Sequence, residues 1–153
     1  MSLKQLSIRV YGIVIHADRG LLLSKEKIKG NFYTKLPGGG LEFGESTENC
    51  LKRELVEELG QGFEIIRLFS VSNLVIESKF MPSTQVVPIY YLAIPKNWAK
   101  LLDFTQKHRL HHPEGDFSTV IQYEWRQITD LSADDFSFPA EKALFPEIIK
   151  AFK

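Results

Sequence analysis

Stretches rich in β-branched and aromatic residues alternate along the chain with short polar and glycine-containing breaks. Such stretches, bounded by turn residues, predict β-strands. The first one ends just before Asp18, Arg19 and Gly20, a turn signal that predicts a hairpin with the next apolar residues. We expect the last stretch to pair with the two long strands in the middle of the chain. The predicted strands are residues 6–16, 21–23, 63–76, 84–94 and 120–128.

A helix is predicted over residues 47–59. Ser46 and Thr47 are good N-cap residues, and Glu48 places negative charge in the first turn, where it suits the helix dipole. Gly60 stands where a helix commonly ends. The sequence thus marks both ends of this helix.

Two other segments also carry helical signals. A short helix is predicted around Trp98, Leu101 and Leu102, within an insertion at residues 95–119 that contains a polar loop. An amphipathic helix is predicted at the C-terminus, with Pro146 in its first turn. Its apolar positions have the i, i+3, i+4, i+7 spacing of one helix face at Phe145, Ile148, Ile149 and Phe152.

Residues 25–40 are rich in lysine and glycine and end in Pro37 and three glycines. Proline and consecutive glycines oppose a helix strongly, so we expect a loop with an exposed backbone here. The order of the other elements predicts a mixed sheet covered by helices on both faces. We expect residues 1–153 to form a single domain.

Composition excludes several classes of protein. Of the 153 residues, 44% are apolar and 25% are charged, which rules out a disordered chain, a collagen or a coiled-coil rod. The 19 basic and 19 acidic side chains cancel, which disfavours a generally basic nucleic-acid binder, and we expect no nucleic-acid polymer as a partner. The one cysteine and the lack of a long apolar stretch predict a cytoplasmic protein without a membrane partner.

The predicted helix at 47–59 concentrates the candidate chemistry. Glu54, Glu57 and Glu58 are three and four residues apart and therefore share one helix face. Like charges at this spacing destabilise a helix by about 0.2–0.5 kcal/mol per pair, and a hard divalent cation such as Mg²⁺ relieves that repulsion. The alternative is an ordinary solvated acidic face without a ligand.

The spacing of this acidic face relative to the preceding glycines is specific. Five residues separate Gly39 from Glu45, and seven more separate Glu45 from Arg53, Glu54 and Leu55. Glu57, Glu58 and Gly60 complete the pattern. The segment, residues 38–61, resembles the box of the Nudix hydrolase family, and its single departure is Gln61 in place of an aliphatic residue. Residues 33–40 and the C-terminal region more loosely resemble the MutT-type members.

The resemblance implies an α/β/α sandwich and hydrolysis of a nucleoside diphosphate linked to another group, with Mg²⁺ or Mn²⁺ as cofactor. It implies that Glu54, Glu57 and Glu58 bind the metal and activate water, with Glu54 a candidate base. Arg53 would orient these carboxylates and Glu45 would tie the loop to the helix. Gly39, between Gly38 and Gly40, would bring a backbone carbonyl to the metal.

Other residues are candidates for the same site. Strand alternation places Glu124 opposite its apolar neighbours, as a further metal ligand or base or as a plain exposed residue. Lys25 and Lys27 are candidates to bind substrate phosphates. Glu141 stands where the MutT-type enzymes carry a base-reading asparagine, which argues against specificity for oxidised guanine. Candidates to stack on a base are Phe32, Tyr33, Trp98 and Phe138, although aromatic residues more often pack in a core.

The expected activity is a metal-dependent pyrophosphohydrolase that converts a nucleoside triphosphate to a monophosphate and pyrophosphate. Two alternatives stay open. One is hydrolysis of a nucleotide sugar or dinucleoside polyphosphate, and the other is a Nudix-like module that binds a nucleotide without catalysis. The intact Glu54, Glu57 and Glu58 argue against the second. The chain is expected to be a monomer or a homodimer.

Overall fold

A computed structural model describes residues 2–107 and 119–153 and contains two β-sheets with helices around them. The larger sheet has the strand order β5 (Gly38–Gly40), β1 (Gln5–Ile13), β8 (Thr84–Pro95), β6 (Phe63–Val71), and β7 (Ile76–Glu77) adds to β8. Its β1 and β8 are parallel and its other pairs antiparallel, so this sheet is mixed.

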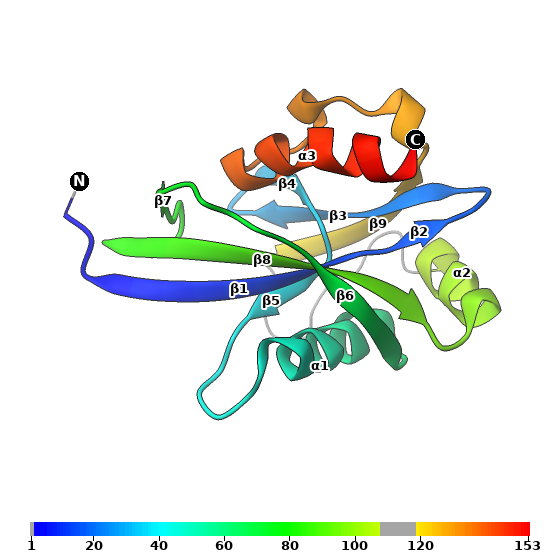
Figure 1. The fold of residues 1–153 in the computed structure, drawn as a ribbon, viewed down its shortest axis with the longest axis horizontal. Coiled ribbons are helices and arrows are strands. Elements are labelled where there is room, and N and C mark those ends of the chain that lie inside the picture. Colours follow the sequence, from blue (N-terminus) through cyan, green and yellow to red (C-terminus); the bar gives the residue numbers. More distant parts are fainter. Residues whose placement is uncertain (1, 108–118) are drawn as a thin grey trace.

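The smaller sheet is antiparallel. It consists of β2 (Ile15–His16), β3 (Gly20–Ile28), β4 (Asn31–Lys35) and β9 (Thr119–Arg126), with β3 pairing to the other three. The sheets lie between α1 (Thr47–Leu59) on one side and α3 (Pro139–Phe152) on the other, while α2 (Trp98–Lys107) flanks them (Figure 1). Two short 3₁₀ turns, Ile128–Asp130 and Ala133–Asp135, precede α3. This arrangement confirms the predicted fold, in which a mixed sheet lies between helices.

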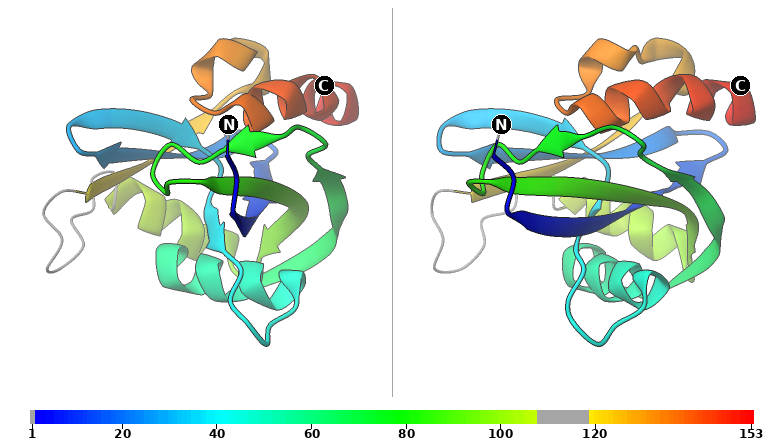
Figure 2. Two further views of the ribbon diagram at one scale, coloured as in Figure 1. Left: turned by 90° about the vertical axis from the view of Figure 1, so that its left-hand side faces the viewer. Right: turned by 60° about the vertical axis from the view of Figure 1, so that its left-hand side comes forward.

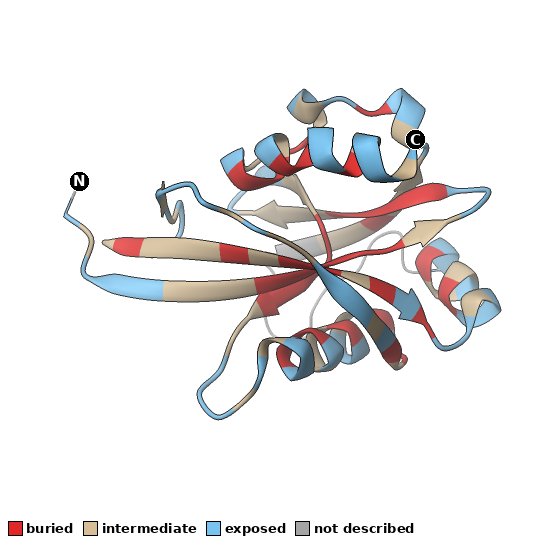
Figure 3. Cartoon of the chain, viewed as in Figure 1, coloured by how far each residue is buried: buried red, intermediate tan, exposed pale blue. Residues whose placement is uncertain are grey.

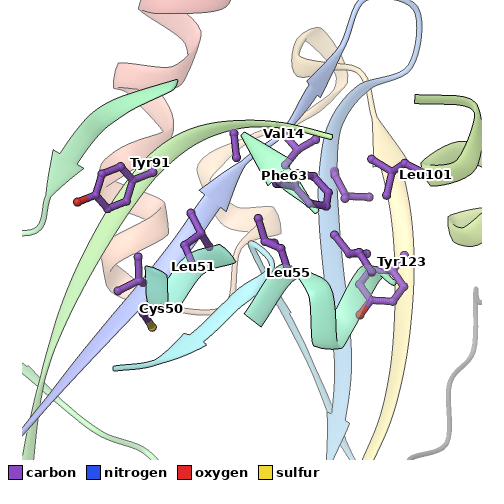
Figure 4. Close-up of a cluster of buried hydrophobic side chains, with 12 residues drawn as sticks. Val14, Cys50, Leu51, Leu55, Phe63, Tyr91, Leu101 and Tyr123 are labelled. Atoms are coloured by element: carbon purple, nitrogen blue, oxygen red, sulfur yellow. The ribbon is translucent and has the colours of Figure 1, made fainter. Parts of the chain in front are cut away.

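Helix α1 has the predicted bounds. The Ser46 hydroxyl accepts a hydrogen bond from the backbone N–H of Asn49 at 3.1 Å, and Gly60 ends the helix with a φ of 75°. Leu51, Leu55 and Leu59 are fully buried beneath the larger sheet, together with Cys50. Figure 4 shows these side chains packed against others from both sheets and α2. The apolar stripe of α1 therefore fixes which face carries the carboxylates.

A second core lies under α3. Leu144, Phe145 and Ile148 of this helix pack with Leu21 and Leu23 of β3. In Figure 3 the buried residues of α1 and α3 face the sheets, and the exposed ones face outward. The two cores hold the sheets as the middle layers of the molecule.

Four predictions about strands and loops were wrong. Residues 63–76 are not one strand, because β6 ends at Val71 and β7 begins at Ile76. Residues 6–16 are not one strand, because the chain passes from the larger to the smaller sheet at Val14, so the hairpin is β2–β3. Residues 25–40 are not a loop: they contain the end of β3 and all of β4 and β5, stabilised by pairing within each sheet. β9 pairs with β3 rather than with β6 or β8.

The C-terminal helix begins earlier than predicted. It begins at Pro139, whose fixed φ suits the first turn, and Pro146 therefore lies inside the helix rather than in its first turn. The short helix predicted around Trp98 is confirmed as α2. The rest of the predicted insertion, residues 108–118, lies outside the described residues.

Candidate active site

The glycine strand β5 places its backbone directly against the acidic face of α1. The N–H of Gly38 donates a hydrogen bond to Oε2 of Glu58 at 3.2 Å. A side chain at Gly39 would overlap the carboxylate of Glu54, and one at Gly38, whose φ is 150°, would overlap the carbonyl of Val10. Only glycine permits so close an approach of the strand to the helix.

Arg53 connects the loop that precedes α1 to the helix. Its guanidinium donates to both carboxylate oxygens of Glu45, at 2.7 and 3.0 Å, and to the carbonyl of Gly40 at 3.1 Å. It also contacts Glu54 at 3.0 Å and Glu57 at 3.5 Å. Hydrogen bonds from Arg53 hold the pKa of Glu45 at about 2. The paired donors of arginine suit this bidentate contact, which fixes the loop relative to the acidic face.

Burial and, to a lesser extent, the nearby Glu54 carboxylate raise the pKa of Glu58 to about 8, despite the opposing influence of Lys35. Glu54 is mostly buried, with 16% of its side chain exposed, whereas 58% of Glu57 is exposed. The Tyr123 hydroxyl donates to the carbonyl of Glu58 at 3.1 Å and fixes the last turn of α1 to β9. Two carboxylates thus lie close together where water only partly solvates them.

The chemistry of this donor set suits a divalent cation, because it offers several carboxylate oxygens, with the backbone of Gly39 close to the carboxylate of Glu54. Among the described residues, no three acidic, histidine or cysteine side chains stand close enough together to hold a metal ion as they are. Arg53 occupies one oxygen of Glu54 instead. Metal binding would therefore require the glutamate side chains to move from these positions.

A cavity of about 760 Å³ is lined in part by Arg9 and Lys35, whose positive charges interact with the Glu58 carboxylate of the acidic face. It runs between the β3–β4 hairpin, the outer part of β1 and β8, the segment around β7, and the start of α3. Figure 2 shows the hairpin beside the segment that joins β7 to β8. The volume lies in the range typical of small-molecule sites.

Two cations lie in the cavity at the end nearest the glutamates. Arg9 donates to the Tyr11 hydroxyl at 2.8 Å, and Lys35 forms an ion pair with Glu26 at 3.0 Å. Burial lowers the pKa of Lys35, but Tyr11, Glu26 and Glu58 outweigh it, so the pKa lies above its usual value. Burial likewise opposes protonation of Arg9, whose pKa is nevertheless raised by Tyr11, Glu54 and Glu58. Both side chains are therefore cationic beside the acidic face.

Glu141 lies in the wall of the same cavity, near the start of α3. It is only 3% exposed, and it accepts a hydrogen bond from the Tyr90 hydroxyl at 3.2 Å. Burial raises its pKa to about 7, against the opposing influence of Tyr90, Lys35 and Arg9. Glu141, which the sequence suggested as a substrate residue, thus lies in the cavity wall and is almost fully buried.

The structure does not bring every predicted residue to this place. Glu124 points away from the face of β9 that carries Tyr123, and it forms an ion pair with Lys25 at 2.8 Å. These two residues neutralise each other, and their roles as metal ligand and phosphate ligand stay predictions. Cys50 is buried, and burial raises the pKa of its thiol to about 12, consistent with a packing role.

Sequence reasoning missed Arg9, Lys35 and Tyr11 as site residues. Arg9 and Tyr11 lie on the first strand, about thirty residues before the glycines, and only the pairing of β1 with β5 brings them close. The available signal was strand alternation: Arg9 and Tyr11 are two residues apart, so their side chains point to the same face of β1. Of the aromatic candidates, Tyr33 and Phe138 line the cavity, whereas Trp98 packs against the core.

A family model for the NUDIX domain matches residues 6–147. The chain therefore belongs to the NUDIX domain family, and the predicted membership among Nudix pyrophosphohydrolases is confirmed at the level of the family.

Several relatives carry the name RNA pyrophosphohydrolase. The protein from Ruthia magnifica is 42% identical over 59 residues, which cover 39% of this chain and 32% of that protein. The protein from Wolbachia pipientis is 24% identical over 155 aligned positions, which cover 92% of this chain and 86% of that protein. The first match thus spans about a third of the relative's length.

Solved structures show the same fold. The MutT protein from Methanosarcina mazei superposes with a TM-score of 0.68 at 16% identity, covering 98% of both chains. This likeness concerns the fold alone. Within the described part of the chain, no helix has the length and apolar character that crossing a membrane requires.

Proposed function

We propose that the chain is a divalent-metal-dependent pyrophosphohydrolase whose minimal substrate is a nucleoside triphosphate, released as nucleoside monophosphate and pyrophosphate. The proposal rests mainly on one observation: β5 holds the acidic face of α1 against the cationic end of a nucleotide-sized cavity. Carboxylates beside cations at the end of a cavity suit a polyphosphate that is shared between a metal ion and basic side chains.

In this proposal Glu54, Glu57, Glu58 and the carbonyl of Gly39 hold Mg²⁺ or Mn²⁺. The metal, when bound, polarises phosphoryl oxygens and lowers the pKa of bound water. Glu54 is the candidate base that takes a proton from the attacking water. Water attacks a phosphorus atom, and the bond from that phosphorus to the bridging oxygen breaks. Arg53 keeps Glu54 oriented through its contact at 3.0 Å.

The substrate residues are those that surround the cavity. Arg9 and Lys35 neutralise the phosphates that extend from the metal site, and the backbone of Gly38 and Gly40 lines their path. Glu141 offers a buried carboxyl group to a polar atom of the base. Glutamate accepts and donates hydrogen bonds differently from asparagine, so the base preference is expected to differ from that of the MutT-type enzymes.

A second candidate is the same reaction at the 5′ end of an RNA. It is favoured by the relatives named RNA pyrophosphohydrolase, one of which aligns with nearly the whole chain. The bond that is broken is the same in both cases, so the candidates differ only in whether a further nucleotide is attached to the first nucleoside.

The test is phosphate and pyrophosphate release from nucleoside triphosphates, nucleotide sugars, dinucleoside polyphosphates and 5′-triphosphorylated RNA, with Mg²⁺, with Mn²⁺ and with chelator. Pyrophosphate from a triphosphate, lost with chelator, supports the proposal. Preference for a nucleotide sugar or dinucleoside polyphosphate would replace it with that activity. Binding of nucleotides without any turnover would instead indicate a nucleotide-sensing module.

A further inference from the structure

Strand β6 forms a free edge of the larger sheet. Among the described strands only β8 pairs with it, so one side of its backbone has no partner strand. Figure 3 shows much of this strand as exposed. Its apolar residues Ile66, Leu68 and Val71 are 41%, 50% and 49% exposed. Exposed apolar side chains gathered along one strand edge mark a surface to which another chain can bind.

The two charged residues of β6, Glu64 and Arg67, lie on the same face of the sheet. Glu64 stands opposite Ile94 of β8, and Arg67 stands opposite Leu92, which packs against the core under α3. Residues two apart on a strand share a face, so both charged side chains lie on the α3 side. Within the described part of the chain neither forms an ion pair, because about 10 Å of strand separates them.

The opposite face of the same edge carries a hollow of about 630 Å³ at the beginning of β6. Val56 of α1, Phe63 of β6 and Pro95 of β8 form its apolar wall. Leu68 points to this face, because it stands opposite Tyr91, which belongs to the core that α1 covers. The edge thus presents both an exposed apolar side chain and an apolar hollow on its α1 side.

We propose that two copies of this chain form a dimer through their β6 edges, which run antiparallel about a two-fold axis between Ile65 and Ile66. In this register Glu64 of each copy faces Arg67 of the other. Leu68 of each copy faces the hollow beside Phe63 of the other. Both matches require the same register, because the two pairs of positions are centred on the same point of the strand. This agreement between charge and shape, on opposite faces of the sheet, is the basis of the inference.

The chain as a whole also favours a second copy as the occupant of this edge. Its 19 basic and 19 acidic side chains cancel, so two copies do not repel each other. Bulges interrupt β6 between Ile65 and Arg67 and between Leu68 and Ser70. Side-chain contacts, rather than a continuous backbone ladder, therefore hold the copies together. A two-fold contact uses each edge once, so the assembly ends at a dimer.

This dimer leaves the acidic face of α1 open. Val56, the apolar helix residue at the hollow, is two residues from both Glu54 and Glu58, which corresponds to about 200° around the helix. The second copy therefore approaches α1 from the side away from these carboxylates. The inference goes beyond the proposed function and does not depend on it.

Sedimentation velocity tests the dimer through its mass, which should be twice the 17.6 kDa of one chain. Glu64→Arg and Arg67→Glu should each raise the dissociation constant of the dimer about 100-fold, because each converts two attractive contacts into two repulsive ones. An equimolar mixture of the two variants should again form dimers, because one copy then offers two arginines and the other two glutamates. The double reversal Glu64→Arg/Arg67→Glu should dimerise by itself.

Matched controls make the same kinds of change elsewhere. Asp134→Arg and Lys142→Glu reverse charges near the start of α3 and should leave the dimer intact. Leu68→Asp should abolish the dimer, because it places a charge against the apolar hollow. Leu6→Asp, at a side chain of β1 that is 71% exposed, should not change the mass. Circular dichroism verifies the folding of every variant.

Three results would overturn the inference. One is a wild-type chain that stays monomeric up to its solubility limit. Another is a dimer that survives both single charge reversals, since the contact would then lie elsewhere on the molecule. The third is a mixture of the Glu64→Arg and Arg67→Glu proteins that remains monomeric although both are folded. Recovery of the dimer in the mixture supports the inference, because two merely misfolded variants would not restore each other.

Discussion

Gly39 shows how much of this site depends on a missing side chain. Its backbone lies so close to Glu54 that a methyl group would occupy the place of the carboxylate. Gly40, the next residue, has its nearest obstacle at 3.4 Å, the end of the flexible Arg9 side chain. Two adjacent glycines therefore differ sharply in their tolerance of substitution.

Gly39→Ala should reduce kcat by about 100-fold, because displacing a catalytic carboxylate by about 1 Å has effects of this size. Gly40→Ala is the matched control and should retain most of the activity. Steady-state kinetics on the best substrate, with circular dichroism to verify folding, measure both. Comparable activity of the two alanine variants would mean that the position of Glu54 is not critical.

Glu58→Gln should lower turnover by at least about 100-fold, since it removes a proposed metal ligand and keeps the side-chain size. It should not unfold the chain, because the wild-type carboxylate is partly buried beside Glu54 and gains little from its charge. Glu48→Gln, at the exposed start of the same helix, serves as control. Wild-type turnover in Glu58→Gln would remove the proposed metal site.

Helix α1 depends on local signals at both ends. The same helix bounds are indicated by the Ser46 cap, by Gly60 in the left-handed conformation and by the buried leucine stripe. The predicted bounds of α1, residues 47–59, match the structure. Residues 25–40 lack such signals. Their lysines and glycines resemble a loop, yet β4 pairs with β3, and β5 pairs with β1. Long-range pairing overrides weak local preference there.

Ser46→Ala should lower the free energy of unfolding by about 1 kcal/mol, because the N–H of Asn49 loses its acceptor at the start of α1. Urea denaturation monitored by circular dichroism gives this value. Ser46→Asp restores a capping oxygen and should recover most of the loss. If the free energy of unfolding of Ser46→Ala equals that of the wild type, packing of the leucine stripe alone maintains the first turn.

At the scale of the whole molecule, Glu141 links two segments that are distant in the sequence. Its carboxyl group accepts a hydrogen bond from Tyr90, which joins α3 to β8 in the second core. Its pKa rises from 4.5 in a free chain to about 7 in the folded protein. The folded state therefore binds more protons than the unfolded state between these values. Stability from this group is complete below about pH 4.5 and is lost as the pH rises through about 7.

In Glu141→Gln the decline in unfolding free energy between about pH 5 and about pH 8 should become shallower, and the variant should be more stable than wild type at the upper end. Urea titrations across this range measure it. Glu147→Gln, an exposed change on the same helix, should leave the slope unaltered. An unchanged slope in Glu141→Gln would show that the carboxyl group stays ionised in the folded protein.

The amino-acid sequence alone determined α1 and the register of its glutamates, because helix caps and i, i+3, i+4 spacing act within a few residues. It also determined the family, because the charged and glycine positions of residues 39–60 keep a fixed spacing. Only the tertiary structure decided that Val14 separates two sheets and that β9 joins β3. It alone brought Arg9, Lys35 and Glu141 into one cavity, because these side chains meet through strand pairing and helix packing between distant segments.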